Sequence, residues 1–152
     1  RNVISIFMNK IMKGDEIYIY GDGNQQRAFS YITDIIAPMA KCGLDKTISK
    51  QVFNLGSDTP VTINQMVDAL EKVTKTKIVR NYLPLRPNEV KIAYCNHSKA
   101  KEMLGFKDIK QLEDGLKEMW AYVQEAGPQN TQYIDMEIES DLLPKTWKDR
   151  LI

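Results

Sequence analysis

Two tyrosines and an arginine–phenylalanine pair are the residues most able to bind a ligand. Tyr18 and Tyr20 lie in an extended apolar segment, and Arg27 and Phe29 follow in a second one after a glycine-rich turn. Side chains two residues apart in a strand share a face. If the two faces coincide, the rings can stack a planar base while the guanidinium holds a phosphate. The same spacing also fits ordinary packing of an aromatic face, so the pattern alone leaves both interpretations open.

A loop bounded by Pro84 and Pro87 carries a second candidate for phosphate binding. Prolines restrict the unbound chain, so Arg86 loses little conformational entropy when it binds and could hold another phosphate oxygen. The alternative is an exposed ion pair between Arg86 and Glu89, which would contribute little to stability.

Acid/base and metal chemistry has weaker support in the sequence. His97 is the single histidine and follows Asn96, a helix-capping residue, so we expect His97 to be exposed or to take part in capping. No cluster of Cys, His, Asp and Glu has the spacing of metal ligands. The turn at residues 21–23 lacks the third glycine and the following helix of a dinucleotide-binding loop.

Helices and short strands must position these residues. Apolar spacings of three and four predict helices over residues 3–13, 35–42, 63–73 and 112–125, with a short helix after Asn96. Runs of β-branched and aromatic residues predict strands over residues 17–20, 27–32, 51–55 and 77–82, the first two as a hairpin, and an edge strand over residues 133–139. We therefore expect a mixed α/β fold.

Capping residues set the expected ends of two helices. Thr62 and Gln65 form a capping-box pattern ahead of the third helix. Asp34 is expected to cap the second helix and Gly43 to end it, with Pro38 removing one early backbone donor.

Composition restricts the classes of partner. The chain has 152 residues, 21 Lys and Arg against 20 Asp and Glu, and a net charge of +1. This balance argues against bulk electrostatic binding of nucleic acid or of an anionic membrane. No apolar run approaches the ~20 residues of a membrane-spanning helix. Cys42 and Cys95 are expected to pack in the core as reduced thiols, which suggests a cytoplasmic protein.

The start of the chain suggests a longer parent protein. The sequence begins at Arg1 rather than Met and enters an apolar helical pattern almost at once. We interpret it as part of something longer.

The order of several short motifs resembles the C-terminal part of one enzyme family. The motifs are Val3 and Ile4 with Phe7, residues 17–23, residues 27–32 with Asp34, residues 53–57, Arg86 with Glu89, residues 98–100 and residues 104–106. Over residues 1–125, in unbroken order, they resemble the NAD-dependent nucleotide-sugar epimerase/dehydratase family. These are the extended short-chain dehydrogenase/reductases that include UDP-glucose 4-epimerase.

The resemblance implies a fold, a domain division and a set of binding residues. The fold would be the α/β substrate-binding portion of a Rossmann-type enzyme, with residues 1–127 binding a nucleotide sugar and residues 128–152 forming a tail extension. Arg27 and Arg86 would hold the diphosphate. The other implied contacts are Asn2 and Val3 near the sugar nucleotide, Tyr18, Ile19 and Tyr20 along the base, Phe29 against the nucleoside and Glu89 near the ribose.

Four positions depart from the family pattern. Asn88 and Glu89 stand where the family more often has Gly and Asp, so the loop is expected to turn less freely. Ala28 and Asn96 each stand where an Asp is common.

The family chemistry needs groups that this chain does not contain. That chemistry transfers a hydride between NAD and a sugar carbon, using a Tyr-x-x-x-Lys pair and a glycine-rich pyrophosphate loop. Neither motif occurs in this sequence, and by resemblance both would lie before Arg1. NAD would thus be bound mainly by a preceding domain, this chain would hold no catalytic residue, and it would be inactive alone.

The predicted function is the substrate-binding half of a nucleotide-sugar 4-epimerase acting on a UDP-hexose, in a parent enzyme that is a homodimer. A dehydratase or decarboxylase of the same family is an alternative, as is a non-catalytic module that binds nucleotide sugars. Single-stranded nucleic-acid binding is a third possibility, against which the balanced charge argues.

Overall fold

The computed structural model describes residues 2–130, 140, 142–143 and 148–149. Its elements, in chain order, are α1 (Val3–Lys13), β1 (Ile17–Tyr20), β2 (Gln26–Arg27), α2 (Ile32–Leu44), the 3-10 helix η1 (Lys46–Ile48), β3 (Val61–Thr62), α3 (Ile63–Thr74), β4 (Arg80–Leu83), β5 (Ile92–Ala93), α4 (Ser98–Leu104) and α5 (Leu112–Ala126). The mixed α/β class agrees with the sequence. The strand expected over residues 133–139 lies outside the described residues.

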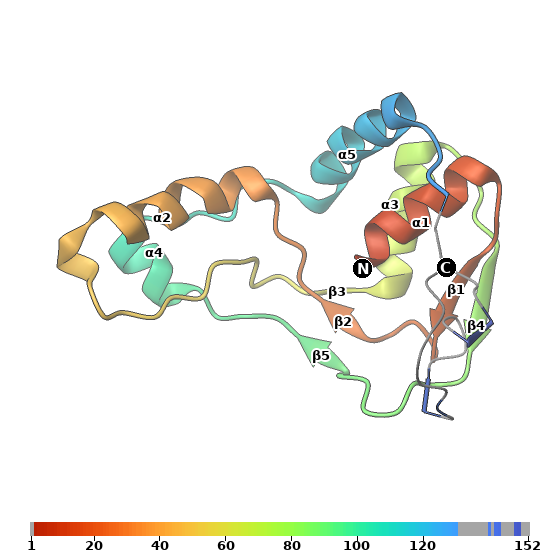
Figure 1. The fold of residues 1–152 in the computed structure, drawn as a ribbon, viewed down its shortest axis with the longest axis horizontal. Helices are drawn as coiled ribbons and strands as arrows, with labels where there is room; N and C mark the ends of the chain where they lie inside the picture. Colours follow the sequence, from red (N-terminus) through yellow and green to blue (C-terminus); the bar gives the residue numbers. More distant parts are fainter. Residues whose placement is uncertain (1, 131–139, 141, 144–147, 150–152) are drawn as a thin grey trace.

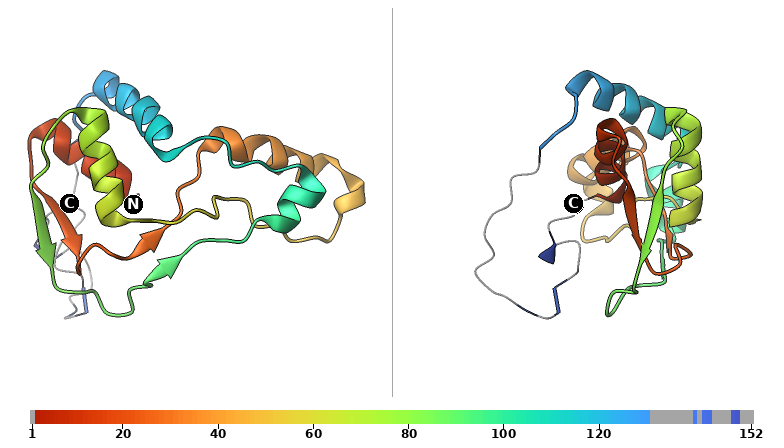
Figure 2. Two further views of the ribbon diagram at one scale, coloured as in Figure 1. Left: turned by 180° about the vertical axis from the view of Figure 1, so that it is seen from behind. Right: turned by 90° about the vertical axis from the view of Figure 1, so that its right-hand side faces the viewer.

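The elements form two lobes joined by a narrow sheet (Figure 1, Figure 2). One lobe contains α1, α3 and α5 with the parallel pair β1 and β4, and the other contains α2 and α4. Between them lies the three-stranded sheet β3-β2-β5, in which β2 runs antiparallel to β3 and parallel to β5.

The larger core lies in the first lobe, between the helices and β1. Alternation along β1 buries Ile17 and Ile19 and turns Tyr18 and Tyr20 to the other face. The segment before β4 adds Ile78, and the apolar stripes of the helices supply the rest of the buried set: Ile4, Phe7, Met8, Ile11, Ile63, Met66, Val67, Ala69, Leu70 and Leu116. This core packs against the face of β1 opposite the two tyrosines.

A smaller core joins η1 and α4. Its buried members are Ile48, Ala100, Leu104 and Phe106, with Phe53 and Leu55 packed against them. The strand expected over residues 51–55 is wrong, because this segment is not assigned to a strand. Its apolar side chains pack sideways onto the small core, but no strand among residues 2–130 pairs with its backbone.

The hairpin expected from residues 17–20 and 27–32 is also wrong. β1 pairs in parallel with β4, and β2 pairs with β3 and β5. The turn after β1 redirects the chain, because Gly21 and Gly23 both adopt positive φ. The second strand ends at Arg27, and Ile32 already begins α2.

The ends of α2 differ from the expected ones. Asp34 lies in the first turn instead of capping it, and its Oδ2 accepts the backbone N–H groups of Ile109 and Lys110 at 2.9 and 2.8 Å. The helix continues through Pro38 and past Gly43 to Leu44. Local pattern does not reveal this role of Asp34, because its bonds go to a segment 75 residues away.

Three further expectations concern single elements. The capping box of Thr62 and Gln65 is confirmed, with bonds of 3.0 and 2.8 Å. The strand expected over residues 77–82 is confirmed only in part, since β4 starts at Arg80. The expected burial of Cys42 is wrong, since its side chain is exposed, whereas Cys95 is partly buried.

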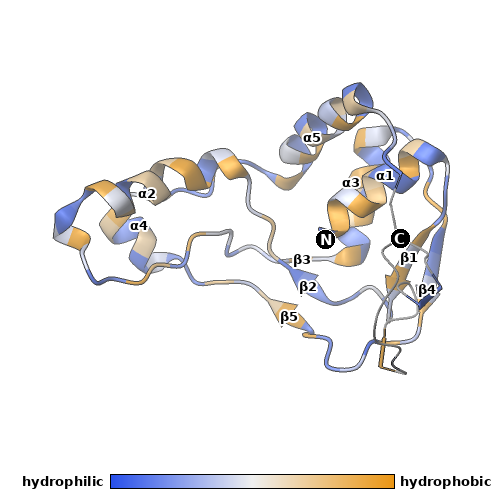
Figure 3. Cartoon of the chain, in the orientation of Figure 1, coloured by the Kyte–Doolittle hydropathy of each residue, from blue (hydrophilic) through white to orange (hydrophobic). Residues whose placement is uncertain are grey.

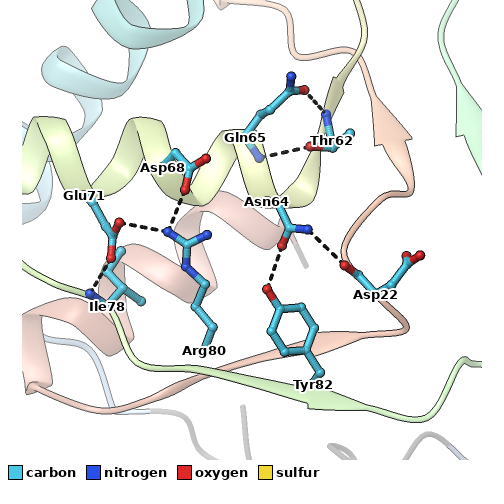
Figure 4. Close-up of polar contacts among 9 residues, drawn as sticks. All are labelled: Asp22, Thr62, Asn64, Gln65, Asp68, Glu71, Ile78, Arg80 and Tyr82. Carbon is cyan, nitrogen blue, oxygen red and sulfur yellow. Dashed lines mark hydrogen bonds and ion pairs between the residues drawn. The ribbon is translucent and has the colours of Figure 1, made fainter.

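Polar side chains of α3 fix β4 against it (Figure 4). Arg80 donates to Asp68 at 2.7 Å and to Glu71 at 2.8 Å, and Glu71 also accepts the Ile78 N–H at 2.8 Å. Burial lowers the pKa of Arg80, but the bonds from Asp68 and Glu71 outweigh it and hold that pKa above its ordinary value. Arg80 therefore stays charged and is paired with two carboxylates.

Asn64, also on α3, ties the turn after β1 to β4. Its Oδ1 accepts the Tyr82 hydroxyl at 3.0 Å, and its Nδ2 donates to the Asp22 carbonyl at 2.9 Å (Figure 4). A Cβ on Gly23 would lie 2.3 Å from that Oδ1, so a glycine is needed here for space as well as for φ. The turn that follows Tyr20 and the strand β4 that precedes Arg86 are thus both anchored to α3.

None of the helices in the described part of the chain is long and apolar enough to cross a membrane.

Candidate functional site

Two arginines from distant parts of the chain meet on one carboxylate. Arg27 at the end of β2 donates to Glu89 Oε1 at 2.6 Å. Arg86 donates to Glu89 Oε2 through Nε at 2.8 Å and through Nη2 at 2.5 Å. The side chain of Glu89 is only 10% exposed, whereas those of Arg27 and Arg86 are 26% and 41% exposed. We call these three residues the arginine cluster.

An aromatic ring adjoins the arginine cluster. The guanidinium carbon of Arg86 lies 4.7 Å from the ring centroid of Tyr20, a cation–π distance. Tyr20 is the last residue of β1 and is held by the parallel pairing with Leu83 of β4. The loop that carries Arg86 begins directly after β4, so this pairing sets both partners side by side.

The other residues expected along the base take different positions. Tyr18 shares the face of Tyr20 and has the Lys10 ammonium 5.4 Å from its ring centroid. Ile19 points into the core and is 2% exposed, so it can offer a ligand only its backbone.

The two residues at the start of the chain serve α1. Asn2 is its N-cap, accepting the Ile4 N–H at 3.0 Å, and its side chain is exposed. Val3 is half-buried and packs against the larger core. Both stand at the N-terminal end of a helix that has no acidic residue in its first turn.

Phe29 lines a pocket of about 470 Å³. Because β1 and β2 belong to different sheets, strand pairing does not bring Phe29 beside the two tyrosines. Its neighbours around the pocket include Asp58, His97, Phe106 and Lys110. The structure thus joins Arg27, Arg86, Glu89 and Tyr20, and it places Phe29 in different surroundings.

His97 has partners that the sequence did not reveal. Its Nδ1 lies 2.9 Å from the Gly56 carbonyl, its Nε2 lies 3.4 Å from Asp58 Oδ2, and its ring packs edge-on against Phe106. The side chain is 12% exposed, so of the two expected roles exposure is wrong, whereas His97 does take the N-cap position of α4, without a capping bond from its side chain. The Oδ1 atom of Asn96 accepts a hydrogen bond from the Ser98 N–H at 2.9 Å, although His97 and not Asn96 stands at the N-cap position of α4. The partners come from a loop about 40 residues earlier, beyond the reach of local pattern.

The loop of Arg86 contains a left-handed residue. Asn88 has φ +59°, in the region that asparagine tolerates better than most residues do. The Glu89 N–H donates to the Arg86 carbonyl at 3.3 Å and closes the turn. This conformation carries Glu89 back toward both guanidiniums.

A separate polar cluster joins the start of α2 to α5. The carboxylate of Glu118 accepts from Tyr31 and from Lys110, each at 2.5 Å. The Lys110 and Tyr31 bonds hold the pKa of Glu118 below its ordinary value. The same bonds raise the pKa of Lys110 and of Tyr31. This cluster ties the two lobes together and lies apart from the arginine cluster in sequence and in elements.

Residues 1–119 match the protein family described as GDP-mannose 4,6 dehydratase. The chain belongs to this family. It is a group of extended short-chain dehydrogenase/reductases, and the part matched is the C-terminal one.

Curated relatives in the family carry several activities in their names. A UDP-glucuronate 4-epimerase from Thermodesulfobacterium geofontis is 35% identical over 116 residues, which are 73% of this chain and 34% of that protein. A UDP-glucuronic acid decarboxylase from Danio rerio is 29% identical over 134 residues, 87% of this chain and 32% of that protein. The chain thus spans about a third of the length of these relatives.

Solved structures share the fold. A UDP-glucuronic acid 4-epimerase from Bacillus cereus, solved with UDP-glucuronic acid and NAD, has a TM-score of 0.76 and 28% identity, covering 82% of this chain and 40% of that one. A UDP-glucose 4-epimerase from Thermotoga maritima, solved with UDP-glucose, has a TM-score of 0.72 and 29% identity with the same coverage. The Rossmann-type enzymes that share this fold confirm the expected fold class.

Proposed function

We propose that this chain is the nucleotide-sugar-binding portion of an NAD-dependent nucleotide-sugar 4-epimerase, with a UDP-hexose as substrate. The observation that carries the proposal is the arginine cluster. Two guanidiniums held by one carboxylate form a preorganised site for a diphosphate, because each can donate two parallel bonds to an oxyanion. Tyr20 beneath Arg86 offers a ring face to the rest of the ligand.

The remaining contacts follow the family pattern. Tyr18, the backbone of Ile19 and Tyr20 would line the base, Phe29 would contact the nucleoside, and Asn2 and Val3 would lie near the sugar nucleotide. These assignments are supported by the matched range, residues 1–119, which includes all of them.

NAD does not fit the glycine turn of this chain. Gly23 is followed by β2, whereas a dinucleotide loop needs a helix whose N-terminus faces the pyrophosphate. The space beside Gly23 is already taken by the Asn64 side chain. We therefore propose that NAD is bound mainly by a preceding domain of the parent enzyme and that no residue of this chain takes part in hydride transfer. We further propose that the parent enzyme is a cytoplasmic homodimer.

A decarboxylase or dehydratase of the same family is the second candidate. Relatives named as UDP-glucuronic acid decarboxylase and as UDP-N-acetyl-alpha-D-glucosaminuronate decarboxylase match this chain over 87% and 81% of its length. The binding residues would be common to these activities, so only products separate them.

Two assays test the proposal. The purified 152-residue chain is incubated with NAD and UDP-glucose, UDP-glucuronate or UDP-N-acetylglucosamine, and the expected result is no turnover. The parent protein, expressed from its complete coding sequence, is expected to give the 4-epimer without loss of carbon dioxide or water. Steady turnover by the 152-residue chain would contradict the proposal that this chain binds the nucleotide sugar without catalysing the reaction. A decarboxylated or dehydrated product would favour the second candidate function.

A further inference from the structure

The side chain of Gln25 connects the two strand ends that carry the candidate site. Gln25 stands between the turn after β1 and the start of β2, and its Nε2 donates to the Tyr20 carbonyl at 2.9 Å. Tyr20 ends β1 and Arg27 ends β2, and these two strands belong to different sheets. Strand pairing among the described residues therefore does not fix the distance between the Tyr20 ring and the Arg27 guanidinium.

The backbone between these strand ends has unusual conformational freedom. Gly21 and Gly23 both adopt positive φ, and glycine populates many backbone conformations at little cost. The backbone of Gln25 itself is held, because its carbonyl accepts the N–H of Ile63, the first residue of α3, at 3.2 Å. Gln25 is thus a fixed point from which an amide reaches back across the glycine turn to the end of β1.

The other half of the Gln25 amide makes no hydrogen bond. Within the described part of the chain, its Oε1 is buried and lacks a partner. Burying an unpaired acceptor destabilises a fold, so such a group needs an explanation. The bond that Nε2 makes to the Tyr20 carbonyl supplies one, because it orders a residue of the candidate site.

We propose that Gln25 is a positioning residue, which holds the Tyr20 ring at the distance from Arg27 that a nucleoside diphosphate spans. This inference rests on the proposed function. A ligand that contacts both the ring and the arginine cluster gains from this fixed distance, because its second contact needs no further ordering of the site. A ligand that contacts only the arginine cluster gains nothing from it. Gln25 therefore favours a nucleoside diphosphate over a bare diphosphate.

The test compares UDP-glucose with inorganic pyrophosphate in calorimetric titrations of the 152-residue chain. Gln25→Met keeps the length of the side chain but cannot donate, and Gln25→Asn is one methylene shorter, which moves its amide out of range of the Tyr20 carbonyl. Both variants are expected to bind UDP-glucose on the order of tenfold more weakly than the wild type, the effect of one hydrogen bond. Both are expected to bind pyrophosphate as the wild type does.

Gln26→Met is the matched control. It makes the same exchange at the next residue, and the backbone bond from the Gln26 N–H to the Lys91 carbonyl at 2.7 Å remains. Its affinities for both ligands are expected to equal those of the wild type. Thermal melts check that each variant is folded. Gln25→Met is expected to melt close to the wild type, because it also removes the unpaired Oε1.

A merely structural role of Gln25 predicts that its two variants lose affinity for both ligands by the same factor, and that result would overturn the inference. Unchanged binding of UDP-glucose by both variants would overturn it too, as would a loss in Gln26→Met equal to that in Gln25→Met. In these three cases, binding of UDP-glucose by the wild type leaves the proposed function standing. A folded wild-type chain that binds neither ligand would overturn the inference and the proposed function together.

Discussion

Arg27 shows what local pattern and fold each contribute to the candidate site. The sequence predicted that Arg27 lies in a strand and suits phosphate binding, but it placed Arg27 at the start of that strand, whereas the structure places it at the end of β2. The partner of Arg27 was not predicted, because Glu89 lies 62 residues away. Local pattern thus identifies side chains able to bind, and the fold decides which of them meet.

Arg27→Ala tests this residue directly. It is expected to weaken binding of UDP-glucose roughly 10- to 100-fold, because a hydrogen bond to a charged group contributes about 1.5–3 kcal/mol. Calorimetry on the 152-residue chain measures the change. Lys117→Ala, which removes an exposed cation paired with Asp114 on α5, is the control and is expected to bind normally. Equal binding by Arg27→Ala and the wild type would exclude Arg27 from the site.

Gly23 and Gly43 form a matched pair for stability. Gly23 has φ +74° and faces Asn64, so Gly23→Ala is expected to lower the free energy of unfolding by about 1–2 kcal/mol or more. Gly43 lies within α2 with open space around it, so Gly43→Ala is expected to raise it by up to about 1 kcal/mol. Urea denaturation followed by circular dichroism measures both. Equal effects of the two substitutions would contradict the conformation of the turn after β1.

Elements were predicted best where their apolar pattern is local. The helices α1, α3 and α5 follow their stripes closely, and the capping box at Thr62 marks the start of α3. Strand pairing was predicted poorly, because β1 pairs with β4 about 60 residues on and not with the next strand. A two-residue strand such as β2 carries too little pattern to show its partners.

The contact between α2 and α5 is expected to depend on pH through Glu118. Its bonds with Lys110 and Tyr31 lower its pKa in the folded chain, so the unfolded chain binds more protons in the acid range. The stabilisation is therefore complete above the ordinary pKa of a glutamate and is lost as pH falls through the lowered value.

Thermal melts from about pH 7 down to about pH 3 measure this dependence. The melting temperature of Glu118→Gln is expected to lie below that of the wild type at neutral pH and to approach it in acid. Glu125→Gln, an exposed substitution on the same helix, is expected to follow the wild type throughout. A constant gap between Glu118→Gln and the wild type would refute the role of the carboxylate.

At the scale of the molecule, α2 presents an apolar face to solvent. Ile32, Ile36 and Met39, at spacings of four and three, are 55–60% exposed. Figure 3 shows apolar residues along this helix, which lies at the outer side of the second lobe. Such a face is expected to drive self-association of the isolated chain.

Sedimentation velocity tests this expectation. The wild-type chain is expected to form assemblies whose size grows with concentration, and Ile36→Lys to shift it toward monomer. Tyr122→Lys, at an exposed aromatic residue on α5, serves as the control and is expected to associate like the wild type. A monodisperse wild-type monomer that melts cooperatively would contradict this expectation and would indicate that the chain folds as an independent module.

The most direct measurement is an NMR titration of the isotopically labelled chain with UDP-glucose, in which changes in the backbone amide chemical shifts locate the binding site. Binding through the arginine cluster predicts that the largest changes fall on β1, on Arg27 and on residues 86–89, while α2 and α4 stay unchanged. Changes confined to α2 and α4, or no change at millimolar ligand with a folded chain, would contradict nucleotide-sugar binding at the arginine cluster.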